Sequence, residues 1–210
     1  MKIHPSRFEQ MTAFTDVALG FLAGYSAVQI LQFSSFKSAV WGWAFVLLAF
    51  SAFAAALAHG FEMTQKTNDR LWMPINLSLG WMLSLFVVGA LIDLSGDAIA
   101  RAALPAALIV GLLFFVITIL RPGSFMTFIA YEAVAMLFSL GVYVFIFFQG
   151  TLLGAGWMLA GVFITILAAV VQALGKVGKS IVWYFDNNGV FHLIQMIGII
   201  LLLVGLKVSL

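Results

Sequence analysis

The sequence predicts an all-α integral membrane protein, a bundle of seven transmembrane helices that forms a single domain over residues 1–210. Hydrophobic residues make up 64% of the chain and charged residues only 9%, and the mean hydropathy is +1.15. Soluble domains carry about 25% charged residues. So few charges do not solvate a surface of this size, whereas a hydrocarbon solvent suits the composition. A spanning helix needs about 20 apolar residues, so a chain of 210 has room for seven spans and short connections.

The apolar residues separate into seven stretches of spanning length. We place the helices at residues 14–33, 39–61, 71–92, 99–120, 125–148, 152–174 and 190–206. Strands are not expected, because an open sheet in lipid leaves its edge groups without partners. The first stretch lacks a small-x-small cleavage site and is read as a retained helix. Turn and breaker residues separate the stretches, in order Ser34-Ser35, 64–70, Ser95-Gly96-Asp97, Arg121-Pro122-Gly123, Gln149-Gly150 and 175–189.

The lysines and arginines predict the orientation of the bundle. Seven of the ten fall on the side of the N-terminus and three on the other side. Positive residues are enriched in cytoplasmic loops, so we expect a cytoplasmic N-terminus and, after an odd number of spans, an outside C-terminus. The seven are Lys2, Arg7, Lys66, Arg70, Arg121, Lys176 and Lys179, and the three are Lys37, Arg101 and Lys207.

Charge and cysteine content exclude several classes of function. A net charge of +2 spread over short loops is not the basic patch of a nucleic-acid-binding protein. The chain has no cysteine, which excludes disulfides, thiolate metal sites and cysteine nucleophiles.

Polar residues gather at one depth of the predicted bundle, in its cytoplasmic half. Such residues are costly inside spans and mark function or helix–helix adhesion. Six helices contribute, which is how a site in a bundle core is built. The candidate cavity comprises Asp16, His59, Asn76, Tyr131, Glu132, Gln172, Asn188, His192 and Gln195.

The last predicted helix carries the most informative set. Asn188, His192 and Gln195 are spaced i, i+4, i+7, so they share one helical face. Asn188 is equally well read as an N-cap, with Asp186 favourable at the positive end of the helix dipole. His192 with Gln195 is also typical of the hydrogen bonds that join membrane helices. Because His59 lies at the same depth, we expect His59 and His192 to face one cavity.

The two intramembrane carboxyl groups, Asp16 and Glu132, sharpen this prediction. A carboxyl group in hydrocarbon is either neutral or paired with a cation. No lysine or arginine lies at their depth, so His59, His192 or a bound cation are the available partners. His59, His192 and Glu132 match the two histidines and one carboxylate used by catalytic zinc. A proton relay and a structural network are alternatives, and haem ligation by the histidines has no supporting motif.

At these residues the chain resembles the CREST superfamily, which contains the alkaline ceramidases and the progestin/adipoQ receptors. The family has Ser-x-x-x-His near the end of helix 2, an Asp near the start of helix 3 and His-x-x-x-His opening helix 7. Three histidines hold a zinc there, and the Ser and Asp lie beside a metal-bound water thought to hydrolyse a lipid amide. His59 matches the first histidine and His192 the last. The segment 185–195 also resembles an uncharacterised bacterial family of seven-helix proteins, which implies a bacterial cytoplasmic membrane.

The chain departs from the CREST pattern at three positions, where Ala55, Asn76 and Asn188 replace the Ser, the Asp and one histidine. Either Glu132 and Asp16 restore a metal site, or the site binds a polar headgroup or small ligand by hydrogen bonds. We favour the second, a protein that binds or senses a lipid or small ligand or acts as an accessory protein. The alternative is a zinc-dependent hydrolase of a lipid amide or ester. Expected partners are membrane lipid and a second copy of the chain or another membrane subunit.

Overall fold

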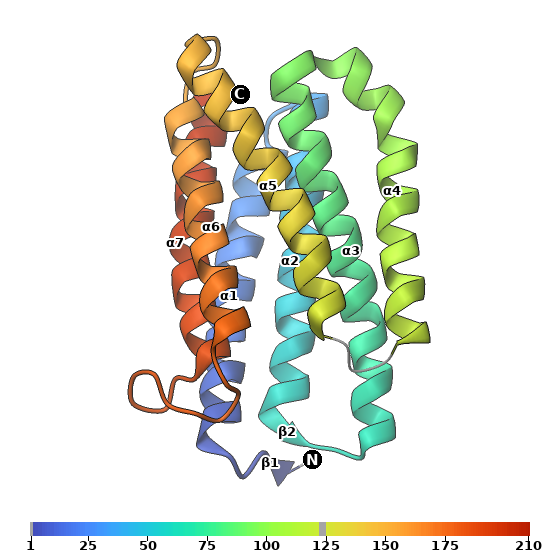
Figure 1. Ribbon diagram of the computed structural model, residues 1–210, viewed down its shortest axis with the longest axis vertical. Coiled ribbons are helices and arrows are strands. Elements are labelled where there is room, and N and C mark those ends of the chain that lie inside the picture. The colour runs from blue at the N-terminus through green and yellow to red at the C-terminus, as the bar shows by residue number, and fades with distance from the viewer. Residues whose placement is uncertain (1, 122–124) are drawn as a thin grey trace.

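The computed structural model describes residues 2–121 and 125–210 and confirms an all-α bundle of seven long helices (Figure 1). All seven are long and apolar enough to cross a membrane. We call the end of the bundle that holds the N-terminus the N-terminal face and the opposite end the C-terminal face. The helices are α1 (Arg7–Leu31), α2 (Phe36–Gly60), α3 (Gln65–Ser95), α4 (Asp97–Leu120), α5 (Phe125–Gln149), α6 (Ala155–Leu174) and α7 (Asn187–Ser209).

Several helices extend beyond their predicted apolar stretches. Helix α1 begins at Arg7 instead of Phe14, and α3 begins at Gln65, where the N-cap Thr64 accepts a hydrogen bond from the Thr67 amide. Hydropathy locates the segment inside hydrocarbon, whereas the helix itself continues until a cap or turn ends it. The extension of α1 matters for function, because it adds Glu9 to the helix that carries Asp16.

A two-stranded antiparallel pair, β1 (Lys2–Ile3) and β2 (Phe61–Glu62), was not expected. It lies on the N-terminal face, beyond the ends of α1 and α2, so its edges are outside the spans where the argument against strands applies. The pair ties the N-terminus to the α2–α3 connection (Figure 1).

Six helices form a closed ring and the seventh lies outside it. Along the chain α1, α2 and α3 pack side by side, α6 packs on α7, α7 packs on α1, and α5 joins α3 to α6. Helix α5 crosses the bundle obliquely, and α4 stands at the edge against α3 (Figure 1). Consequently only three α4 residues are buried, Ala100, Gly111 and Phe114.

Helix α4 is held to α3 by small residues and by side-chain bonds to its backbone. A Cβ atom on Gly80 would lie 2.7 Å from the carbonyl oxygen of Gly111, and one on Gly111 would lie 2.8 Å from that of Gly80. Nearby, Ser84 Oγ donates to the Ala107 carbonyl at 2.7 Å, and Trp81 Nε1 donates to the Leu108 carbonyl at 3.2 Å. Close backbone approach at small residues is how membrane helices associate.

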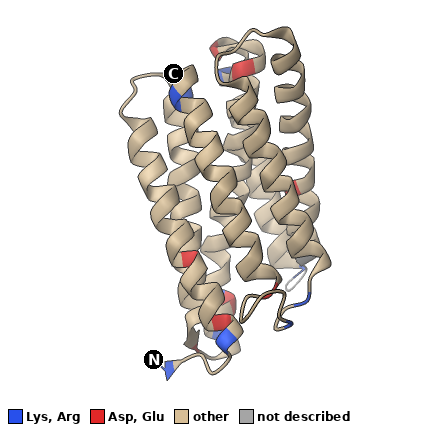
Figure 2. Ribbon diagram, turned by 90° about the vertical axis from the view of Figure 1, so that its left-hand side faces the viewer, with Lys and Arg blue, Asp and Glu red and all other residues tan. Residues whose placement is uncertain are grey.

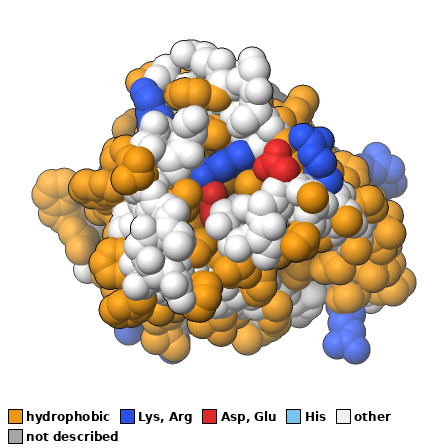
Figure 3. Space-filling view, turned by 90° about the horizontal axis from the view of Figure 1, so that it is seen from above, with side chains coloured by type: hydrophobic (Ala, Val, Ile, Leu, Met, Phe, Trp, Pro, Cys, Tyr) orange, Lys and Arg blue, Asp and Glu red, His pale blue; other side chains and the backbone are white. Residues whose placement is uncertain are grey.

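Charged side chains lie mainly at the two ends of the bundle (Figure 2). One pair at the C-terminal face is buried: Lys37 Nζ lies 2.5 Å from Asp93 Oδ1, with the two side chains 9% and 2% exposed. Tyr143 donates to Asp93 Oδ2 at 2.9 Å, and Lys37 donates to Ser209 Oγ at 2.7 Å. Basic and acidic side chains are visible in a hollow at the centre of this face (Figure 3). The network joins α2, α3, α5 and α7, although the sequence placed Lys37 in a loop.

Candidate functional site

A cavity of about 810 Å³ lies inside the bundle and is lined by all seven helices. It reaches the surface at the N-terminal face, where exposed Gln65, Asp69 and Arg121 line it. Eight of the nine residues predicted for the site line this one cavity: Asp16, His59, Asn76, Glu132, Gln172, Asn188, His192 and Gln195.

Tyr131 is the exception and corrects the prediction. Its hydroxyl lies 2.8 Å from Ser84 Oγ and donates to the Gly80 carbonyl at 3.0 Å. Its ring stacks on Phe114 of α4 with a centroid distance of 4.7 Å. Neighbouring residues of a helix point about 100° apart, so with Glu132 facing the cavity Tyr131 faces α3 and α4.

Asp16 and His192 meet in the wall between α1 and α7. His192 Nε2 lies 3.3 Å from Asp16 Oδ1, and His192 Nδ1 lies 2.9 Å from Thr15 Oγ1. The Thr15 hydroxyl donates its only proton to the Thr12 carbonyl at 2.8 Å, so it accepts from His192 and Nδ1 carries a hydrogen. His192 Nε2 then faces Asp16 Oδ1.

His59 has a different carboxylate partner, Glu9, whose Oε2 lies 2.7 Å from His59 Nδ1. Glu9 was not among the predicted site residues, because it lies before the first apolar stretch. A signal was present, since Glu9 and Asp16 are seven residues apart and share a helical face. His59 also packs edge-on against Trp72, at a centroid distance of 5.7 Å.

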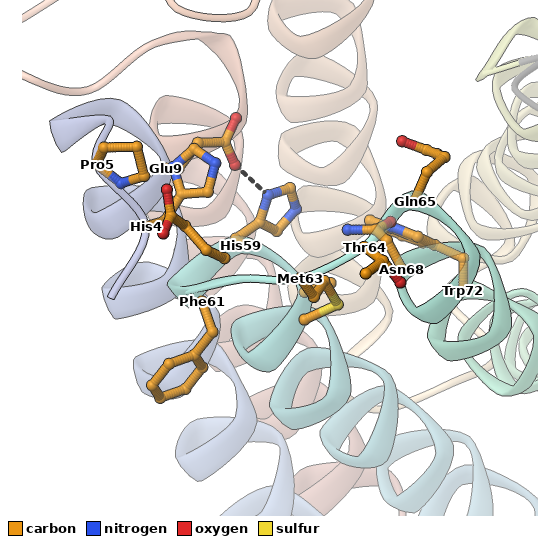
Figure 4. A pocket seen from close by; sticks show the side chains of 12 residues that line it. His4, Pro5, Glu9, His59, Phe61, Met63, Thr64, Gln65, Asn68 and Trp72 are labelled. Carbon is orange, nitrogen blue, oxygen red and sulfur yellow. Dashed lines mark hydrogen bonds and ion pairs between the residues drawn. The ribbon is translucent and has the colours of Figure 1, made fainter. Parts of the chain in front are cut away.

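His59 stands between the cavity and a second hollow on the N-terminal face. This hollow has a volume of about 790 Å³. His59 lies between Glu9 on one side and Asn68 and Trp72 on the other (Figure 4). Both hollows are lined by His59, Gln65, Asn68 and Trp72.

The start of α7 corrects the capping interpretation of Asn188. The N-cap is Asp186, whose Oδ1 accepts from the amides of Asn188 and Gly189 at 3.0 and 3.3 Å. Asn188 lies inside the helix, and its Oδ1 accepts from Gln172 Nε2 at 3.2 Å. Asn187 Nδ2 donates to the backbone carbonyl of Gln172 at 2.8 Å. These bonds tie the start of α7 to the end of α6.

Gln195 and Glu132 occupy the next level of the cavity wall. Gln195 Nε2 donates to Thr165 Oγ1 at 3.3 Å, and Thr165 in turn donates to the Gly161 carbonyl at 3.0 Å. Glu132 is 5% exposed. We expected it to approach the two histidines, yet within the described part of the chain no hydrogen bond or ion pair joins it to either. It shares only their cavity.

The predicted zinc ligands do not form one set in the structure. His59 contacts Glu9, His192 contacts Asp16 and Thr15, and Glu132 stands apart on α5. Over residues 2–121 and 125–210 no group of three or more His, Cys, Asp or Glu side chains is placed to hold a metal ion. The prediction missed this because matching depth leaves open which helices are neighbours, and α1 separates the two histidines into different pairs.

Unpaired polar atoms gather around the cavity. Among the described residues, six buried side-chain atoms have no hydrogen-bond partner, and every one belongs to a residue that lines this cavity. An unsatisfied buried polar group costs about 1–3 kcal/mol, so this concentration is expensive for the fold alone. The atoms are Asp16 Oδ2, Trp41 Nε1, Glu132 Oε2, Gln172 Oε1, Asn187 Oδ1 and Gln195 Oε1.

Above the polar level the lining is largely apolar, although it includes Trp41, whose ring packs on Phe45 and Phe86 and whose Nε1 is unpaired. On α7 the lining continues from Gln195 to Ile199 and Leu202, a distance of about 10 Å at the rise of an α-helix. The same inner section is lined by Phe45, Leu48, Leu83, Phe86 and Met136. The cavity therefore has an open polar part and an inner apolar part, and both fit an amphipathic occupant.

The chain belongs to a family of unknown function, DUF6962, which matches residues 11–209. Comparison with curated proteins and comparison with solved structures found no match. The family match covers all seven helices except the first residues of α1.

Proposed function

We propose that this seven-helix protein binds a small amphipathic ligand or a membrane lipid in the bundle cavity, and acts as a binding or sensing protein. The observation that carries the proposal is that six unpaired buried polar atoms all belong to residues of one cavity. A polar group bound at the level of Glu132 and Gln195 would supply the hydrogen bonds that Glu132 Oε2 and Gln195 Oε1 lack, and its binding would recover part of the free energy that the unpaired atoms cost.

The shape of the cavity supports a molecule of moderate size. About 810 Å³ falls within the range of small-molecule sites, roughly 300–1,000 Å³. Such sites are largely apolar with a few polar groups that orient the ligand. The inner section around Phe86 and Leu202 suits an apolar chain, and the level of Glu132 and Gln195 suits the polar group attached to it.

A zinc-dependent hydrolase has less support. Its ligand set would need His59 and His192 on one ion, but these residues are paired with Glu9 and Asp16 in separate places. Elemental analysis of purified protein tests this alternative, because one zinc per chain would favour a hydrolase over a binding protein.

A cavity-filling variant tests the proposed function. Ala52 is buried on α2 and lines the cavity, so Ala52→Phe should fill its middle. Leu57→Phe places the same side chain on the outward face of α2, where Leu57 is 47% exposed, and is the matched control. Lipids and small molecules that co-purify with the protein are extracted and measured by mass spectrometry. We expect a stoichiometric molecule with wild type and Leu57→Phe, and its loss from Ala52→Phe. Equal recovery from all three proteins would refute binding in the cavity.

A further inference from the structure

We infer that the polar group bound in the cavity is a protonated amine, an ammonium group attached to an apolar chain. This inference rests on the proposed function and adds the chemical class of the ligand. It comes from three properties of the cavity: the kind of unpaired atom, the charge of the lining and the apolar inner section.

Three of the unpaired atoms are amide oxygens, which only accept hydrogen bonds, and two are carboxyl oxygens, which accept when the carboxyl group is ionised. Five of the six are oxygens, and only Trp41 Nε1 is a donor. Two assignments follow from hydrogen-bond accounting. Gln195 must turn its NH₂ group toward Thr165, whose own proton goes to the Gly161 carbonyl, and this leaves Oε1 free. Asn187 must turn its NH₂ group toward the Gln172 carbonyl, which leaves Oδ1 free. The ligand therefore has to donate.

The charge of the lining favours a cation. Asp16 and Glu132 are 2% and 5% exposed, and each has one carboxyl oxygen without a partner. Arg121 is the single lysine or arginine in the described lining, and it is exposed at the mouth. An anionic ligand would meet the Glu132 carboxyl group, which has no cationic partner among the described residues, and the unpaired oxygen of Asp16, in a medium of low dielectric constant. An ammonium group offers a positive charge and three N–H donors from one atom.

The apolar section of the cavity favours an amine over a bare metal cation as the ligand, although a metal cation also takes oxygen ligands. A single ion would occupy a small part of about 810 Å³ and would leave the walls around Phe45, Phe86 and Leu202 uncovered. An alkylammonium ion covers both parts of the cavity. The same chemistry comes from two sources, a free alkylamine or the amine headgroup of an aminophospholipid.

The test uses full-length protein in nanodiscs of phosphatidylcholine, which lacks N–H donors. Trp41 and Trp72 line the cavity, so their fluorescence reports binding. The probes share an octyl chain: octylamine, octyltrimethylammonium, octanol and octanoate. We expect octylamine to bind saturably. Octyltrimethylammonium, which has the charge but no N–H donor, should bind more weakly by about tenfold or more. Octanol should also bind more weakly than octylamine, and octanoate should not bind.

Variants locate the effect. Glu132→Gln and Asp16→Asn keep the side-chain size and remove one carboxyl group each, and each should weaken octylamine binding about tenfold or more. Asp97→Asn removes a carboxyl group that is 53% exposed at the C-terminal face, and it should leave the affinity within about twofold. Thermal unfolding confirms that each variant is folded. If one carboxyl variant fails to fold, the other decides.

The outcomes separate this inference from the proposed function. One result would overturn the inference of an amine and keep the proposed binding function. In that result octanol and octylamine bind equally well, Glu132→Gln leaves both affinities unchanged, and Ala52→Phe abolishes binding. A saturable response to sodium or calcium chloride, lost in Glu132→Gln while octylamine gives none, would also overturn it. No response to any probe, together with no co-purified molecule, would refute both. If phosphatidylethanolamine added to the nanodiscs competes with octylamine, the source of the amine is a lipid headgroup. If it does not compete, the source is a free amine.

Discussion

At the level of single residues, the site is governed by where protons lie. The Thr15 hydroxyl donates its hydrogen bond to the Thr12 carbonyl of its own helix. His192 is therefore oriented with Nδ1–H toward Thr15 and Nε2 toward Asp16. This orientation is the carboxylate–imidazole arrangement by which proteins fix a histidine tautomer. It keeps His192 as part of the wall and leaves the second oxygen of Asp16 for a ligand.

The arrangement predicts the effect of removing the Thr15 hydroxyl. Thr15→Val keeps the shape of the side chain but leaves a buried imidazole N–H without an acceptor, so the free energy of unfolding should fall by about 1–3 kcal/mol. Thr118→Val is the matched control, because among the described residues the Thr118 hydroxyl bonds only the Phe115 carbonyl of its own helix. Denaturant titration in detergent measures both. An equal loss in the control would contradict the role assigned to Thr15.

At the level of helices, the arrangement depends on where two backbones approach closely. The crossing of Gly80 with Gly111 brings α4 onto α3, and Tyr131 of α5 completes the junction. The same junction explains why Tyr131 leaves the cavity. Helix α4 makes few other buried contacts, so its position depends on this crossing.

A methyl group at the crossing should therefore displace α4. In Gly111→Ala the new Cβ would meet the Gly80 carbonyl oxygen and Ser84 Oγ at 2.8 and 2.7 Å. We expect a loss of about 1–3 kcal/mol in the free energy of unfolding. Gly141→Ala on α5 is the control, because in the described part of the chain nothing lies within 4 Å of its Cβ position and alanine favours a helix by up to about 1 kcal/mol. Equal effects of the two changes would contradict the close crossing.

At the level of the whole molecule, the two ends of the bundle differ. The cavity reaches the surface at the N-terminal face, whereas the buried network of Lys37, Asp93 and Tyr143 joins four helices at the C-terminal face. Under the proposed function a ligand would therefore enter at the N-terminal face, while the buried network holds the helices together at the other end.

The network predicts strong coupling between Lys37 and Asp93. Asp93→Asn leaves a buried ammonium without its charge partner and should cost about 3–5 kcal/mol. Lys37→Met alone should also lower the free energy of unfolding. The double variant Lys37→Met with Asp93→Asn should recover more than half of the loss caused by Asp93→Asn, because the amide oxygen introduced at position 93 still accepts from the Tyr143 hydroxyl. Unfolding of the three variants gives the coupling energy. Additive losses would show that the two residues act independently.

The orientation of the bundle in its membrane remains a prediction. The termini lie at opposite ends (Figure 1), and seven of the ten basic residues belong to the side of the N-terminus. Because the chain has no native cysteine, single cysteines serve as markers. A membrane-impermeant maleimide should label Asp97→Cys in intact cells and should label Glu62→Cys only after the membrane is opened. The reverse pattern would invert the orientation.

The sequence by itself determined the number of helices, their approximate bounds and the depth of the polar residues. Hydropathy identifies the segments that lie in hydrocarbon, and the position of a residue within its segment gives its depth. The spacing of Asn188, His192 and Gln195 shows which side chains share a face. Depth and face were sufficient to select eight residues that line one cavity.

The tertiary structure decided which of these residues meet. The order of the helices in the ring and the rotation of each about its axis depend on packing between segments far apart in the sequence, which periodicity within one helix does not contain. For this reason only the structure shows that His192 pairs with Asp16 and His59 with Glu9. It also shows that Tyr131 faces α3 and that Lys37 is buried beside Asp93.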